Sequence, residues 1–154
     1  MAFLNLPEKD IFLGIEAESS EEALAIVCAK LLDEGKIKEG YLEAILAREA
    51  EYPTGLDLEG INVAIPHTDW IWSNTTQLVV ATFAKPVTWR SMEDPDETVD
   101  VSMMIMSLFD DPSHQIEALT KIMGVVQDQG LVARLAGSSS VQEIAQAFIQ
   151  REEQ

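Results

Sequence analysis

The sequence predicts an α/β fold, a single domain in which one mixed central β-sheet is sandwiched between layers of helices. A length of 154 residues suits one domain, and 47% hydrophobic residues are enough for a core. Helical periodicity occupies both ends of the chain, whereas short β-branched or apolar runs occupy its middle. Strict alternation of strand and helix is absent, which argues against a doubly wound nucleotide-binding fold. We expect residues 1–154 to form this one domain.

The first part of the chain predicts one strand followed by two helices. Ser19 and Glu22 have the spacing of a capping box, and apolar residues recur behind them at helical spacing as far as Gly35, a natural helix stop. Cys28 falls on the apolar face of this helix, where a small buried hydrophobe is the expected role. The expected elements are a strand over 11–15, a helix between Ser19 and Gly35, and a helix over about 39–51.

The middle of the chain predicts strands, and the last third predicts helices. The expected strands are apolar runs over 61–65, 77–83 and 99–108. Residues 91–97 are acidic and contain a proline, so we expect a solvated hairpin loop between the last two strands. Helical periodicity returns after Pro112, and Ser140 and Glu143 have capping-box spacing. The expected helices cover about 113–127, 131–135 and 140–151.

The charge balance excludes several classes of partner. Lys plus Arg number 10 and Asp plus Glu number 27, which gives a net charge of −17. A protein this acidic repels nucleic acid and anionic lipid, and it suits either a basic protein partner or simple solubility. The N-terminal segment MAFLNLPEKD lacks the pattern of a signal peptide, and the apolar runs are too short to cross a bilayer. We therefore expect a cytoplasmic protein with no direct membrane insertion.

The common catalytic and binding motifs are missing from the sequence. It contains no dinucleotide-binding glycine motif, no P-loop, no H-E-x-x-H and no C-x-x-C. Two histidines and a single cysteine do not easily make a structural zinc site. We expect no cofactor and no metal, and the search for chemistry narrows to His67, His114 and a few cations.

His67 follows directly on the proline that should end the strand over 61–65. Pro66 has no backbone N–H to give to a sheet, so we expect His67 to be displayed at the strand end, where functional groups gather. Arg48 lies near the end of the second helix, and its planar donors match phosphate oxygens. An arginine there can equally be a dipole partner or half of a surface ion pair. The residues alone leave both readings open.

The segment AREAEYPTGLDLEGINVAIPH, residues 47–67, resembles the signature of the phosphotransferase-system (PTS) EIIA proteins of the fructose–mannitol type, or type 2. The shared features are an Arg-Glu pair, a Pro-Thr-Gly turn and a strand ending in Pro-His. The spacing from Gly55 to His67 is most similar to the galactitol-specific branch. The later segments KPVTW, VDVSMMIMSLF and DDPSHQIEALTKI also resemble the family, so the likeness covers nearly the whole chain.

This resemblance implies a cytoplasmic phosphocarrier with α/β/α layers. His67 would accept a phosphoryl group from the phosphocarrier protein HPr and pass it to a cysteine of a sugar-specific EIIB, which acts with the membrane component EIIC. Arg48 would stabilise the phosphate, and His114 would be a supporting imidazole. Galactitol or a related sugar or polyol is the favoured cargo. The alternative is a regulatory module, like the nitrogen-related members, whose phosphorylation state controls a protein partner without sugar transport.

Overall fold

The computed structural model describes residues 5–152, with side chains as far as residue 150. Residues 1–4, which begin the N-terminal segment discussed above, lie outside the described residues. Residues 153 and 154, the last two of the predicted domain, also lie outside them. The strands are β1 Ile11–Ile15, β2 Gly55–Leu56, β3 Asn62–Ala64, β4 Gln77–Arg90 and β5 Thr98–Leu108. The helices are α1 Ser20–Asp33, α2 Tyr41–Glu51, α3 Gln115–Val126, α4 Gln129–Ala136 and α5 Val141–Glu152. Short 3-10 turns are η1 Glu8–Asp10, η2 Trp70–Trp72 and η3 Pro112–His114.

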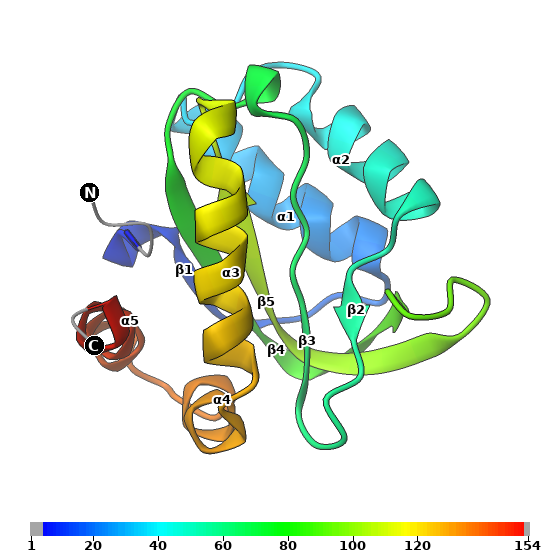
Figure 1. Ribbon diagram of the computed structural model, residues 1–154, viewed down its shortest axis with the longest axis vertical. Coiled ribbons are helices and arrows are strands. Elements are labelled where there is room, and N and C mark those ends of the chain that lie inside the picture. The colour runs from blue at the N-terminus through cyan, green and yellow to red at the C-terminus, as the bar shows by residue number, and fades with distance from the viewer. Residues whose placement is uncertain (1–4, 153–154) are drawn as a thin grey trace.

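The five strands form one mixed sheet in the order β1-β4-β5-β3-β2. β1 is parallel to β4 and β3 is parallel to β5, whereas β4–β5 and β2–β3 are antiparallel. Figure 1 shows α3 in front of this sheet and α1 behind it. The predicted mixed sheet between helical layers is therefore confirmed.

Two hydrophobic clusters hold the layers together, one on each face of the sheet. Successive residues of the central strands enter opposite clusters, as the two-residue period of a strand requires. Val80 and Ile105 pack with α3, α4 and α5, whereas Val79 and Met104 pack with α1 and α2. Because both faces are covered, β4 and β5 read as nearly continuous apolar runs.

The predicted helix caps are present where the sequence placed them. The Ser19 Oγ accepts a hydrogen bond from the backbone N–H of Glu22 at 3.1 Å, and the Ser140 Oγ accepts one from Glu143 at 3.2 Å. The α2 helix begins at Tyr41 rather than near residue 39, because Gly40 adopts a left-handed φ of 96°. A Cβ at Gly40 would lie 2.6 Å from the ring of Trp72, so only glycine fits this close approach.

The strands differ from the prediction most clearly at β2 and β4. β2 was not expected, since two residues are too few to show a period. β4 extends past the predicted residue 83 and contains Pro86, which is tolerated because β4–β5 pairing shifts register between Thr82 and Val87. Among the apolar residues that recur at helical spacing between Ser19 and Gly35, Leu32 does not join the buried face of α1 and is 45% exposed. Within residues 5–152, no helix is long and apolar enough to cross a membrane.

Candidate functional site

The end of α2 and the loop that follows β3 meet at a hollow of about 190 Å³. We call this the His67 hollow. It is lined by the end of α2, the turn over 52–54, His67, and two residues of the loop between β4 and β5, Met92 and Pro95. Three segments far apart in sequence therefore meet around one imidazole.

The orientation of the His67 ring is fixed by its own backbone. Nδ1 lies 3.1 Å from the carbonyl oxygen of Ile65. A carbonyl oxygen can only accept, so in the neutral ring Nδ1 carries the proton and Nε2 keeps a lone pair. The ring is therefore held in the tautomer that leaves Nε2 as the nucleophilic nitrogen.

His67 is recessed rather than displayed, contrary to the expectation from the sequence. Only 9% of the residue is exposed, and the following Thr68 is 8% exposed. Pro66 lacks an N–H, but its carbonyl still accepts a hydrogen bond from Ser107 of β5 at 3.3 Å. The loop therefore follows the sheet for two residues beyond the end of β3, and His67 lines the hollow as a largely buried residue.

Burial lowers the pKa of His67 below its ordinary value of 6.5, and the positive charge of Arg48 adds to this effect. The hydrogen bond to Ile65 and the charge of Asp69 act in the opposite direction and are outweighed. Desolvation disfavours the charged imidazolium, so the neutral ring predominates near pH 7. A neutral imidazole is the form that can attack phosphorus.

Arg48 lies in the last turn of α2 and shares the hollow with His67. Its guanidinium carbon lies 5.0 Å from the centroid of the Tyr52 ring, which is a cation–π distance. Between residues 5 and 150, Arg48 forms no salt bridge, although the protein contains 27 acidic residues. Its charge remains available to an anion that enters the hollow.

The structure brings Arg48 and His67 together but does not bring His114 into the hollow. His114 is partly buried at the end of η3, immediately before α3. It is not among the residues that line the His67 hollow. Cys28 is buried, which raises the pKa of its thiol to about 12, as fits a small core residue rather than a reactive cysteine.

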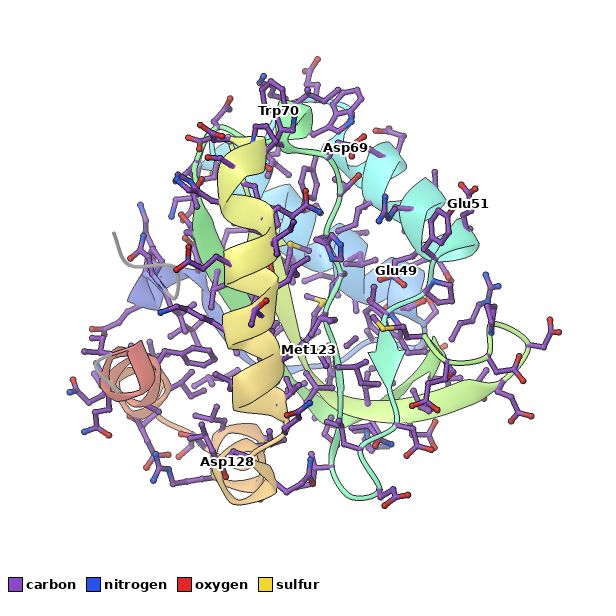
Figure 2. The ribbon with its side chains drawn as sticks, viewed as in Figure 1. Glu49, Glu51, Asp69, Trp70, Met123 and Asp128 are labelled. Atoms are coloured by element: carbon purple, nitrogen blue, oxygen red, sulfur yellow. The ribbon has the colours of Figure 1, made fainter. Side chains whose placement is uncertain are left out.

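Several supporting residues were not singled out from the sequence. Glu49 is partly buried and accepts hydrogen bonds from Thr54, whereas Glu51 is exposed. Figure 2 shows Glu49 on the inner side of the end of α2 and Glu51 at its outer edge. Tyr52 and Met92 are 58% and 42% exposed, so the hollow has an apolar rim. In the sequence, these supporting residues are marked only by the Arg48-Glu49 pair and by Tyr52, an aromatic residue directly before a proline.

The end of β4 and the loop between β4 and β5 are held at the site by hydrogen bonds. The Met92 N–H donates to the Gly55 carbonyl at 2.8 Å, and Arg90 Nη1 donates to the Ala50 carbonyl at 2.7 Å. A Cβ at Gly55 would lie 2.6 Å from the Arg90 carbonyl oxygen, so the role of Gly55 is to allow this close approach. The acidic loop is solvated, as predicted, and it also forms one wall of the hollow.

A family model described as "phosphoenolpyruvate-dependent sugar phosphotransferase system, EIIA 2" matches residues 5–151. The chain belongs to this EIIA family. The resemblance seen in the sequence is therefore confirmed, and this EIIA shares the phosphotransfer role of its family in the general sense. Among the described residues, no group of three or more His, Cys, Asp or Glu side chains is placed to hold a metal ion.

Relatives of this EIIA include components specific for two polyols. The galactitol-specific EIIA component of Escherichia coli K12 is 30% identical over 122 residues, which is 79% of this chain and 81% of that protein. The mannitol-specific EIICBA component of the same strain is 26% identical over 151 residues, which is 95% of this chain but 22% of that longer protein.

Solved structures share the fold over nearly their whole length. Mannitol IIA from Escherichia coli superposes with a TM-score of 0.76 at 26% identity, covering 94% of this chain and 99% of that one. Enzyme IIA-Mtl, in a complex with phosphorylated enzyme IIB-Mtl from Escherichia coli, gives a TM-score of 0.78 at 24% identity, covering 96% and 99%.

Proposed function

We propose that this EIIA is a cytoplasmic phosphocarrier that accepts a phosphoryl group on His67 from phosphorylated HPr and passes it to a cysteine of a sugar-specific EIIB. The main support for this proposal is that His67 and Arg48 line the same hollow. The neutral His67 ring carries its proton on Nδ1, and Arg48 forms no salt bridge among the described residues. EIIB then phosphorylates a sugar or polyol carried through EIIC. His67 and Arg48 supply the nucleophile and the positive charge that such a transfer needs.

The chemistry requires little beyond positioning. The Nε2 lone pair of His67 attacks phosphorus, and the bond between phosphorus and the donor's histidine nitrogen breaks with its electron pair returning to that nitrogen. Arg48 offsets the charge on the phosphoryl oxygens, because a guanidinium can donate two parallel hydrogen bonds to them. The Ile65 carbonyl accepts the Nδ1–H throughout and stabilises the positive ring that forms during attack.

His114 is proposed as a supporting imidazole that acts on the phosphoryl group or its partner from the start of α3. Its position at the junction of η3 and α3, outside the lining of the hollow, fits a supporting role better than a nucleophilic one. A supporting group of this kind speeds transfer without forming the bond.

Galactitol is the favoured cargo, and an EIIB is the favoured acceptor. The galactitol-specific relatives are 30% identical to this chain, and a structural relative was solved in a complex with phosphorylated enzyme IIB-Mtl. Specificity belongs to the EIIB that accepts the phosphoryl group, so acceptance by one EIIB among several identifies the sugar class. A regulatory role without transport remains the competing function, and no EIIB would then be phosphorylated.

The test is a phosphotransfer assay with phosphorylated HPr and a panel of EIIB proteins that includes the galactitol-specific type. Wild-type protein is expected to form an acid-labile, base-stable phosphoprotein and to discharge fastest to the galactitol-type EIIB. His67→Ala should form none, because no other group replaces the nucleophile. His114→Ala should still form one, roughly two to three orders of magnitude more slowly. Full labelling of the His67→Ala protein would overturn the proposal.

A further inference from the structure

A partly buried carboxylate lies behind the His67 hollow and has no part in the transfer chemistry described above. Glu49 accepts hydrogen bonds from the Thr54 backbone N–H at 3.1 Å, from the Thr54 hydroxyl, and from Trp89 Nε1 at 3.2 Å. Burial raises the pKa of Glu49, and the hydrogen bonds from Thr54 and Trp89 and the charge of Arg90 oppose that rise. Three donors converging on one carboxylate form a built contact rather than a chance surface interaction.

Backbone hydrogen bonds continue from this contact to the reactive ring. The Thr54 carbonyl accepts from the Ile65 N–H at 3.1 Å, and the Ile65 carbonyl accepts from His67 Nδ1 at 3.1 Å. Thr54 is 3% exposed, and the next residue along, Gly55, pairs with Ala64 in the β2–β3 ladder. A side chain on α2 is thereby linked to the histidine through two residues, without touching it.

We propose that Glu49 is a positioning residue for phosphoryl acceptance. By holding Thr54, Glu49 holds the Ile65 carbonyl where it fixes the His67 ring in the Nδ1–H tautomer, with Nε2 directed into the hollow. This inference rests on the proposed function, since it names the residue that prepares the nucleophile. The hydrogen-bonding geometry of Glu49, rather than its charge, carries the effect.

Substitutions at Glu49 separate geometry from charge. In Glu49→Gln the amide oxygen can accept from the Thr54 N–H and from Trp89, while the amide N–H can donate to the Thr54 hydroxyl, so all three contacts survive without the charge. Glu49→Ala removes all three contacts. Ser140→Ala is the matched control, because it removes the hydrogen-bonding cap at the start of α5, and Ser140 lines neither the His67 hollow nor the cavity beside Glu49.

The experiment measures three quantities on each protein. They are the tautomer of His67 by long-range ¹H–¹⁵N correlation, the dependence of phosphorylation rate on phosphorylated HPr concentration, and the midpoint of urea unfolding. In Glu49→Ala we expect a mixed His67 tautomer and a kcat lowered roughly 10- to 100-fold with KM little changed. Glu49→Gln should stay within about threefold of wild type for kcat, since the orienting contacts remain. Ser140→Ala should lower the unfolding midpoint only.

Each of three results would overturn the role of Glu49. A Glu49→Ala protein with wild-type tautomer and kcat but a lower unfolding midpoint would show that Glu49 supports the fold alone. A Glu49→Gln protein as slow as Glu49→Ala would show that charge matters instead of geometry. If Glu49→Ala does not fold, Thr54→Val removes the hydroxyl donor by itself, and an unchanged tautomer and rate in that variant would equally overturn the proposal.

Failure of the proposed function would be distinguishable from failure of this inference. The tautomer measurement needs no phosphoryl donor, so it tests the link from Glu49 to His67 directly. A wild-type protein that accepts no phosphate would overturn the function while the tautomer result still stands. Normal phosphorylation of wild type with no effect of Glu49→Ala on tautomer or rate would overturn only the role of Glu49.

Discussion

Lys36 and Arg48 are cations of the same acidic protein, and their surroundings are opposite. Lys36 is 14% exposed and forms ion pairs with the fully buried Asp10 and, at 4.0 Å, with Glu34. Arg48 stacks on Tyr52 beside His67 and forms no salt bridge among residues 5–150. The first cation is neutralised and joins segments of the fold, whereas the second keeps its charge for a ligand.

The ion pair with Lys36 allows Asp10 to stay ionised although it is buried. Burial opposes its ionisation, but hydrogen bonds with Glu34, Lys36 and Gln77 outweigh that effect and lower its pKa. The hydrogen bond with Asp10 in turn raises the pKa of Glu34. The cluster links the start of β1, the end of α1 and the start of β4, so its charges serve stability. A mutation in each region should therefore change a different property.

The largest expected effect on stability comes from Lys36→Met. It removes the only cation that pairs with the buried Asp10 carboxylate among the described residues and leaves it with Glu34 and Gln77 as hydrogen-bonding partners. Removing one half of a buried ion pair costs about 3 kcal/mol, the lower end of the usual range, because Lys36 is partly exposed. Urea unfolding measures the loss, and phosphorylation of the remaining folded protein should proceed at the wild-type rate. A loss below about 1 kcal/mol would mean that the cluster behaves as a surface pair.

Arg48 should show the reverse pattern, with an effect on rate rather than stability. Arg48→Lys keeps the charge but loses the forked geometry, and Arg48→Ala loses both, so the phosphorylation rate should fall progressively, by roughly two to three orders of magnitude for alanine. Unfolding free energy should change by less than about 1 kcal/mol. Lys85→Ala removes an exposed cation elsewhere and is the control for net charge. Equal rates for all variants would make Arg48 an ordinary surface residue.

A smaller effect is expected on the titration of His67. Its pKa lies below 6.5, so the acid limb of the acceptance rate should have its midpoint below 6.5, because the protonated ring has no lone pair. Arg48→Ala should raise this pKa and Asp69→Asn should lower it, since their charges act in opposite directions. NMR titration of the ring protons measures both shifts.

The free energy of unfolding should also fall as pH drops below about 6.5, because His67 in the unfolded chain takes up its proton at a higher pH than in the folded protein.

The smallest effect is expected from Cys28→Ala, which removes one buried atom from a face of α1. We expect a loss of about 1 kcal/mol in unfolding free energy and unchanged phosphotransfer. The thiol should react slowly with alkylating reagents, because burial raises its pKa to about 12. Rapid labelling coupled to loss of activity would point to a cysteine with a function.

Most helices and strands could be predicted from the sequence, because helix caps and apolar periodicity depend on residues that are close together in the chain. The caps at Ser19 and Ser140 depend on residues three positions away, and the helical and strand periods of the apolar residues are visible in the sequence. β2 was missed because two residues show no period. The pairing of Asp10 with Lys36 was also missed, since it depends on how β1 and the end of α1 pack together.

The site was predictable mainly through the family resemblance. Arg48 and His67 are 19 positions apart, and spacing does not show that they share a hollow. Because Pro66 lacks an N–H, the sequence predicts that the sheet ends there, yet the Pro66 carbonyl still accepts a hydrogen bond from Ser107 and draws His67 inward. The wall formed by Met92 depends on contacts between β2 and the acidic loop, which no local pattern records.

The most direct measurement is the identity of the phosphorylated nitrogen, obtained by ³¹P and ¹⁵N NMR on the protein after reaction with phosphorylated HPr. The Ile65 carbonyl occupies the Nδ1 side of His67 at 3.1 Å, and Arg48 lines the same hollow as the ring. We predict one phosphorylated site, at Nε2 of His67. A phosphoryl group on Nδ1 of His67, or on His114, would contradict the proposed assignment of nucleophile and support.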